Sequence, residues 1–275
     1  MTIESERRPA SGDAGGGPGD GGPGAPPPGR HRRGFPLIAI LASVVVILAA
    51  VAFAVVAVHV HDEHGPGVVE TLGHMRPSGV PADVSTPEAN LMALSPVPPK
   101  AAPGFDLTDQ NGQTLSLSSF RGKVVILEAM DPHCTDICPI VSQEFVDAYH
   151  DLGPAASNVV FAAVNVNQYH AGVADMMAFS RAHQLTSIPS WHFFTGPVPE
   201  LKSVWHSYGI AVQAPNPNAD IIHTSIMYFI GPDGVERYLA SPSDDHTKSG
   251  TSYLPAGQLA SWGHGIAAVA EHLIS

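Results

Sequence analysis

An apolar run that leads directly into the two cysteines constrains the fold of this chain most. Residues 124–127 are continuously apolar, which is typical of a strand in the middle of a sheet that is covered on both faces. Residues 131–139 follow and contain Cys134 and Cys138, the only two cysteines among 275 residues. Open α/β sheets place their chemistry at the carboxyl ends of such strands, so we expect the cysteine pair to lie at that edge.

The segments after residue 105 alternate between strand and helix patterns. Asn111-Gly112 predicts a hairpin between residues 105–108 and 113–116. Further strands are predicted at 123–127, 159–164, 191–194, 222–230 and 235–239, and helices at 139–150, 175–183, 200–208 and 254–274. This order predicts an α/β domain over residues 101–275, with a mixed sheet and helices on both faces.

The first hundred residues have a different composition. Residues 1–34 are rich in Gly and Pro and predict a disordered tail. Residues 35–58 contain no charged side chain and are long enough for a transmembrane helix. The basic cluster before this run predicts a cytoplasmic tail and an extracytoplasmic domain. A cleaved signal peptide is the alternative, but the apolar run is longer than a typical signal segment.

Residues 59–100 are rich in His and Pro and predict an extended linker. His59, His61 and His64 in this linker could capture a metal ion or serve only as a polar spacer. The net charge of −12 is unevenly distributed, because residues 1–34 carry five Arg against four acidic residues and the acidic excess follows the apolar run. An acidic domain without a basic stripe excludes nucleic-acid binding.

Two thiols this close together can share a soft metal ion or form a reversible disulfide. A structural disulfide between Cys134 and Cys138 would stabilise the fold little, because the loop that it closes is short. Pro139 suits the first position of a helix, which would make Cys138 the N-cap. A helix amino terminus stabilises a thiolate, so we expect both cysteines to titrate below a free thiol.

The spacing of the cysteines bears on the choice between metal binding and redox chemistry. Dithiol oxidoreductases usually have two residues between their cysteines, whereas this chain has three. A copper ion held by two thiolates needs a third donor, typically His. His223, at the start of the predicted strand 222–230, is the best candidate, and an ordinary solvated histidine at a strand end is the alternative.

A set of short motifs resembles the SCO/SenC family. The motifs are Phe105-x-Leu107-x-Asp109-x-x-Gly112, Gly122-Lys123-Val124, Cys134-x-Asp136-Ile137-Cys138-Pro139, His223-Thr224 and Tyr228-Phe229-Ile230-Gly231-Pro232-Asp233-Gly234. The family consists of membrane-anchored, thioredoxin-like copper chaperones that help to assemble the copper A centre of cytochrome c oxidase. The resemblance implies a thioredoxin-like fold and a copper site, Cu(I) or Cu(II), formed by Cys134, Cys138 and His223.

The chain departs from the family pattern in three places. Thr135 replaces a common proline and frees one backbone N–H. His133 beside Cys134 is either an added ligand or a neighbour that favours the thiolate. Residues 165–170 replace an acidic segment of the family, which leaves a docking role for this segment unsupported. The aromatic residues Trp191, Phe193, Phe194, Trp205 and Tyr208 could form a docking surface, but such residues are more often core.

These features favour a copper metallochaperone that delivers copper to the copper A subunit of cytochrome c oxidase outside the cell membrane, and they leave open whether the chain is also an enzyme. The alternative is a thiol-disulfide oxidoreductase, in which Cys134 and Cys138 are the redox-active pair and His223 is dispensable. A copper or redox sensor is a third reading, for which the chain has no recognisable output domain. The sequence does not fix the oligomeric state.

Overall fold

The computed structural model describes residues 75–275. The predicted tail, the apolar segment 35–58 and the histidines at 59, 61 and 64 lie outside the described residues. Within 75–275, no helix has both the length and the apolar composition that are needed to cross a bilayer.

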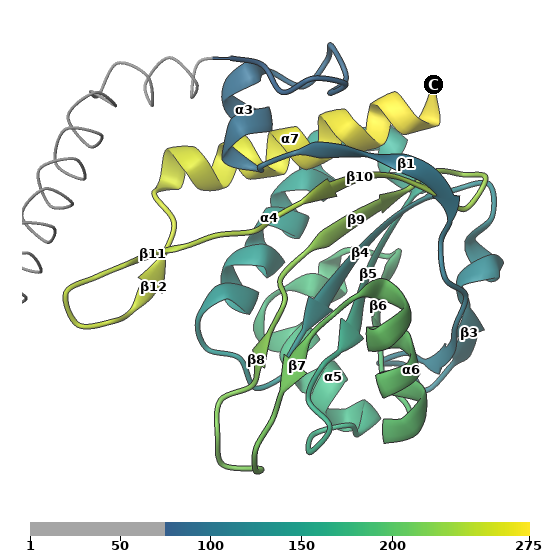
Figure 1. The fold of residues 1–275 in the computed structure, drawn as a ribbon, viewed down its shortest axis with the longest axis vertical. Coiled ribbons are helices and arrows are strands. Elements are labelled where there is room, and N and C mark those ends of the chain that lie inside the picture. The colour runs from purple at the N-terminus through teal and green to yellow at the C-terminus, as the bar shows by residue number, and fades with distance from the viewer. Residues whose placement is uncertain (1–74) are drawn as a thin grey trace, which may run out of the picture. The chain divides into compact units, whose positions relative to one another are not determined.

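A six-stranded mixed sheet forms the centre of the domain, in the order β1-β10-β9-β4-β5-β6 (Figure 1). Its strands are β1 (Ser95–Ala101), β4 (Val124–Met130), β5 (Val159–Asn165), β6 (Trp191–Phe194), β9 (Met227–Ile230) and β10 (Val235–Ala240). Strands β4, β5 and β6 are parallel, while β9, β10 and β1 add on in antiparallel fashion. The predicted mixed α/β sheet is confirmed, and β4 lies inside it as its apolar run predicts.

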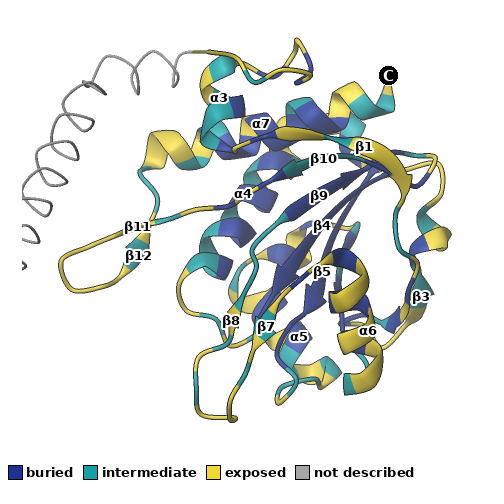
Figure 2. Cartoon of the chain, viewed as in Figure 1, coloured by how far each residue is buried: buried dark blue, intermediate teal, exposed yellow. Residues whose placement is uncertain are grey.

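Helices cover both faces of this sheet, and the residues that face it are buried (Figure 2). One face packs against α3 (Thr86–Leu91), α4 (Ile137–Leu152), α5 (Val173–Ala182) and α7 (Ala256–Ile274). The other face packs against α6 (Val198–Tyr208) and the hairpin of β2 (Asp106–Thr108) and β3 (Thr114–Ser116). In β4, Val124 and Ile126 face the first layer, and Val125 and Leu127 face the second. The alternation of strand side chains thus divides one apolar run between two cores.

The remaining elements are short. They are the strand pairs β7 (Val212–Gln213) with β8 (Ile222–His223) and β11 (Asp245–His246) with β12 (Ser252–Tyr253), and the 3₁₀ turns Leu117–Phe120, Gly153–Asn158 and Leu185–Ser187.

The second half of the predicted linker belongs to the folded domain instead of being an extended tether. Ser85 accepts a hydrogen bond from Glu88 N, and Glu88 returns one to Ser85 N, so a capping box starts α3. Met92 and Leu94 are fully buried in the core. The prolines in β1 are compatible with a strand only at a sheet edge, which is where β1 lies.

The predicted strand 222–230 is interrupted. Residues 222–223 pair with β7, and only 227–230 join the central sheet. The backbone between them leaves the sheet, where Thr224 N donates to Ala211 O and Ser225 Oγ donates to Glu128 Oε1. His223 therefore lies on a small hairpin instead of on the central sheet.

The aromatic residues considered for a docking surface are core residues. Trp191, Phe193, Phe194, Trp205 and Tyr208 are all at most 6% exposed. Trp205 Nε1 donates to Asn165 O, and the hydroxyl of Tyr208 donates to Pro103 O. Their polar atoms are thus satisfied inside the domain, as expected for buried Trp and Tyr.

Two carboxyl groups are buried between the sheet and α4. Glu128 of β4 is 1% exposed and Glu144 of α4 is fully buried. Both oxygens of Glu144 and one of Glu128 have no hydrogen-bond partner in the described part of the chain. Burial raises the pKa of Glu128 to about 8 and raises the pKa of Glu144 well above its usual range. Burial therefore favours the protonated form of both carboxyl groups in the folded domain.

This burial predicts that the domain loses stability as pH rises. The protonated form of Glu128 is favoured in the folded state, so its stabilisation is complete below its unfolded pKa of 4.5 and is lost as pH rises towards about 8. A shift of this size corresponds to a loss on the order of 5 kcal/mol in the free energy of unfolding. Glu128→Gln should reduce the pH dependence and exceed the wild type in stability at pH 9, measured by urea unfolding at pH 5, 7 and 9. The exposed Glu271→Gln is the matched control, and equal slopes in Glu128→Gln and wild type would contradict the prediction.

Candidate functional site

The loop between β4 and α4 carries the cysteines and is held by Asp131. The carboxylate Oδ1 of Asp131 accepts hydrogen bonds from His133 N at 2.8 Å and from Asn167 Nδ2 at 2.9 Å. Its backbone carbonyl accepts from Cys134 N at 3.1 Å. Asp commonly makes this type of side-chain turn, which fixes the chain where it leaves a strand. The loop thus places Cys134 at the carboxyl edge of the sheet, as predicted.

Helix α4 begins at Ile137 and not at Pro139. Asp136 is the N-cap, and its Oδ1 accepts from Ile137 N at 2.8 Å. The prediction that Cys138 is the N-cap and Pro139 the first helical residue is therefore wrong. Asp is a far better N-cap than Cys, and proline is tolerated throughout the first turn, where its missing N–H has no partner to lose.

The two thiols have different environments. Cys134 is partly exposed, donates its S–H to Asp136 Oδ1 at 2.8 Å, and accepts a hydrogen bond from Cys138 N at 3.2 Å. Cys138 is 1% exposed and packs in the same core as Val141 and Phe145 of α4. Both are free thiols.

The expected low pKa of Cys138 is contradicted. The hydrogen bond of its thiol to Cys134, together with burial, raises the pKa of Cys138 well above its usual range. The amino end of α4 favours a thiolate, but the hydrogen bond with Cys134 and the burial of the side chain together outweigh this effect. The Asp136 carboxyl shows the opposite shift, since the hydrogen bond from Cys134 lowers its pKa.

His223 faces the cysteine loop from the β7–β8 hairpin. Its Nδ1 lies 3.1 Å from Thr224 O, and a carbonyl oxygen can only accept, so Nδ1 carries the proton. The Nε2 lone pair is left available as a ligand. Burial lowers the pKa of His223, although Asp131 and Asp136 act in the opposite direction. The imidazole is thus neutral near pH 7, the form that binds metals.

The cysteine loop and the β7–β8 hairpin line one cavity of about 600 Å³. Cys134 and His223 both line it, together with Asp131 and Asp136, whereas Cys138 is buried in the core and does not line it. In the described part of the chain, only His133, His170 and Asp175 form a group of three donors within 4.8 Å of one another. Joint ligation of one ion by Cys134, Cys138 and His223 therefore requires side-chain or hairpin movement.

His170 and Asp175 are residues of this edge that the sequence reasoning did not single out. Met130 at the end of β4 pairs with Asn165 at the end of β5. Residues that follow two neighbouring parallel strands meet at one edge of the sheet. His133 and His170 each lie a few residues beyond such a strand end. This shared position is the sequence signal that could have identified His170, whereas Asp175 lies in α5 and has no such signal.

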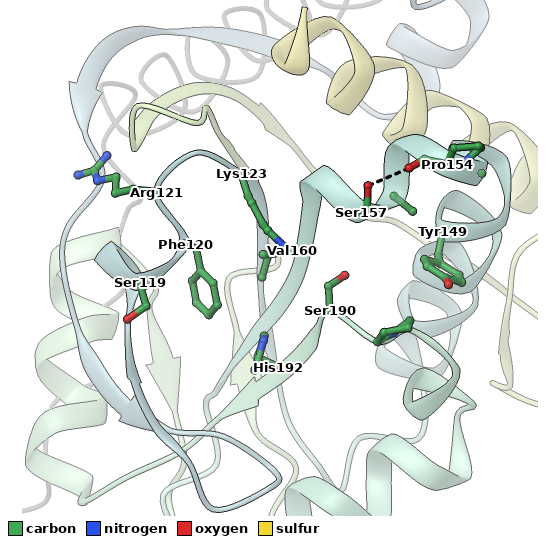
Figure 3. A pocket seen from close by; sticks show the side chains of 13 residues that line it. Ser119, Phe120, Arg121, Lys123, Tyr149, Pro154, Ser157, Val160, Ser190 and His192 are labelled. Carbon is green, nitrogen blue, oxygen red and sulfur yellow. Dashed lines mark hydrogen bonds between the residues drawn. The ribbon is translucent and has the colours of Figure 1, made fainter.

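A second cavity, of about 650 Å³, lies at the opposite end of the parallel strands (Figure 3). Lys123, Ser190 and His192 line it. Nδ1 of His192 forms a hydrogen bond with Asp109 Oδ2 at 3.0 Å, and Ser190 Oγ has no hydrogen-bond partner among residues 75–275. Lys123 precedes β4 and Cys134 follows it, so the length of β4, about 20 Å, separates this cavity from the thiols.

Comparisons with known proteins agree with this architecture. The SCO1/SenC family model matches residues 96–249, more than half of the chain. The chain is 26% identical over 132 residues to the SCO1 protein homolog of Bacillus subtilis, which covers 47% of this chain and 68% of that protein.

Two solved structures are similar to the domain. The apo Sco1 protein of Thermus thermophilus matches with a TM-score of 0.50 and 22% identity, over 64% of this chain and 93% of that one. Bradyrhizobium japonicum ScoI, solved with copper bound, matches with a TM-score of 0.48 and 21% identity, over 63% of this chain and 99% of that one.

A mixed α/β fold of the thioredoxin type, with a dithiol loop at the carboxyl end of a central strand, defines a thioredoxin-like dithiol protein. Within this class, the chain belongs to the SCO1/SenC family.

The unequal burial of the thiols predicts unequal reactivity. In the reduced protein, iodoacetamide should modify Cys134 at least tenfold faster than Cys138, because only the first sulfur is accessible. Mass spectrometry over time, on Cys134→Ser and Cys138→Ser, measures each rate separately. In urea the two variants should react alike. Equal rates in the folded variants would show that Cys138 is not buried as described.

Proposed function

We propose that this chain is a copper-binding protein that acts in the assembly of cytochrome c oxidase. The main support is that the accessible Cys134 thiol and the neutral imidazole of His223 line the same cavity, and that Nε2 of His223 is available as a ligand. Membership of the SCO1/SenC family supports copper as the ion. Thiolates are soft ligands that select Cu(I), and imidazole adds a donor that also suits Cu(II).

In this proposal copper is the cargo, and Cys134, Cys138 and His223 are its ligands. Cys134 and His223 lie on the cavity and reach an incoming ion first. Cys138, in the first turn of α4, joins when its thiol, which is hydrogen-bonded to Cys134, loses its proton. Release would proceed in the reverse order, by ligand exchange with the copper A site of the oxidase subunit.

The proposed location follows from residues outside the described part of the chain. The apolar segment 35–58 would anchor the chain in the cell membrane, with the amino terminus in the cytoplasm and the domain outside. The prolines and histidines of residues 59–74 would then form the beginning of the tether.

Copper retention tests the ligand set. The purified, reduced chain loaded with one equivalent of copper should keep the ion through dialysis against a weak chelator. Cys134→Ser, Cys138→Ser and His223→Ala should each lower the retained copper at least tenfold, because each removes one of three donors. Metal analysis and the visible spectrum of the Cu(II) form are the measurements.

His206→Ala is the matched control, since His206 is an exposed histidine of α6 that does not line the cavity. It should retain copper as the wild type does. If His223→Ala retains copper with unchanged affinity and spectrum, the proposed ligand set is wrong.

A thiol-disulfide oxidoreductase is the second candidate, favoured by the hydrogen bond between the two thiols. An accessible cysteine beside a buried one can attack a disulfide or a peroxide and then be resolved by its neighbour. The metal-free chain should then turn over such a substrate, with both cysteines essential and His223 dispensable. Negligible turnover would remove this candidate.

A further inference from the structure

Three donors beside the thiols form a second cluster, separate from the proposed ligand set. The donor atoms of His133, His170 and Asp175 lie within 4.8 Å of one another. His133 Nε2 is 3.8 Å from Asp175 Oδ1, and the two imidazole rings stack with centroids 3.7 Å apart at an angle of 25°. Two imidazoles and a carboxylate whose donor atoms lie this close together are a common ligand set for transition-metal ions.

The fold holds each of these residues by its own contacts. His133 N donates to Asp131 Oδ1 at 2.8 Å, and His170 N donates to Asn167 Oδ1 at 3.3 Å. Asp175 lies in the first turn of α5, where its Oδ2 accepts from Gly172 N at 3.2 Å. This contact uses one carboxylate oxygen and leaves Oδ1 turned towards His133. The site is therefore largely organised by contacts of the protein alone.

One hydrogen bond joins the loops that carry the two histidines. Asn167 Nδ2 donates to Asp131 Oδ1 at 2.9 Å, and the same Oδ1 anchors His133. Asn167 Oδ1 in turn anchors His170. Both atoms of one amide side chain thus fix the relative position of the two imidazoles, and both partners of its Nδ2 bond are buried.

We propose that His133, His170 and Asp175 bind a divalent transition-metal ion. Imidazole and carboxylate are borderline to hard donors, and the Irving–Williams order places Cu(II) first among the divalent ions that they bind. Bond lengths of about 2.0–2.2 Å require the donors to come closer than they are, to roughly 3.3 Å. The side chain of His133 is 51% exposed and can rotate to close this distance.

The position of the cluster gives it a role that rests on the function proposed above. His133 and His170 line the same cavity as Cys134 and His223. An ion held by the cluster lies at the border of this cavity, next to the softer thiol site. The cluster is thus a docking site that captures Cu(II) beside the cysteines, from which it exchanges into or out of the thiol site.

The test uses a background in which other copper ligands are removed. The full chain with Cys134→Ser, Cys138→Ser and His223→Ala, and with His59, His61 and His64 replaced by alanine, is titrated with Cu(II). We expect one equivalent to bind, with nitrogen hyperfine structure from two imidazoles in the electron paramagnetic resonance spectrum. Adding His133→Ala and His170→Ala should weaken binding at least 100-fold.

Two further variants separate ligation from effects on folding. Asp175→Asn keeps the shape of the side chain and should weaken Cu(II) binding about tenfold. His264→Ala removes a surface histidine that pairs with Asp151 at 3.3 Å, and should change nothing. Thermal melting checks that all variants fold. If the His133→Ala, His170→Ala protein binds Cu(II) as the background does, the inference is overturned.

The two proposals fail in different ways. If the wild type retains no copper through its thiols but the background still binds Cu(II) through His133 and His170, the docking site stands and the proposed function fails. If His133→Ala, His170→Ala has no effect on Cu(II) binding in the background, the docking site fails, while copper retention through Cys134, Cys138 and His223 is judged by its own experiment.

Discussion

The buried carboxylate of Asp131 is the contact on which the functional edge of this domain depends. Asp131 directly follows the central strand β4. Its carboxylate accepts hydrogen bonds from His133 N and from the side-chain amide of Asn167 in the neighbouring loop. Its own carbonyl accepts from Cys134 N. When a buried acceptor holds several donors, any rearrangement that leaves one of these groups unpaired costs free energy. The position of Cys134 and the spacing of the two loops therefore share one cause, which is the set of hydrogen bonds that Asp131 accepts at the end of β4.

Much of the fold follows from periodicity. The run Val124–Leu127 is apolar on both faces because β4 is covered by α4 on one side and α6 with the β2–β3 hairpin on the other. The start of α3 was missed because Pro-rich segments usually favour extended chain, whereas Met92 and Leu94 supply enough burial to dock the segment. The sequence predicts one continuous strand over residues 222–230, whereas the structure has two strands, β8 and β9. Hydrophobicity alone does not show where a backbone leaves a sheet.

The candidate site was predictable in its residues more than in its chemistry. The family resemblance predicts one copper site that includes Cys134 and His223, and in the structure both residues line one cavity. The pKa of Cys138 was predicted in the wrong direction, because the helix boundary moved from Pro139 to Ile137. With Asp136 as the N-cap, Cys138 turns into the core beside Val141. A shift of two residues changes which face of a helix a side chain occupies.

The asymmetry of the two thiols has a physical consequence for metal exchange. The raised pKa of Cys138 means that its proton must leave before its sulfur can bind a metal ion, and the thiol is buried in the core. Cys134 has an ionised neighbour, Asp136, which already accepts its S–H. A proton from the pair therefore has a path outwards through Cys134 and Asp136 to the cavity. Because His223 also borders this cavity and is neutral, copper entry and proton loss would use the same cavity in the proposed function, and the departing proton would offset part of the charge of the entering ion.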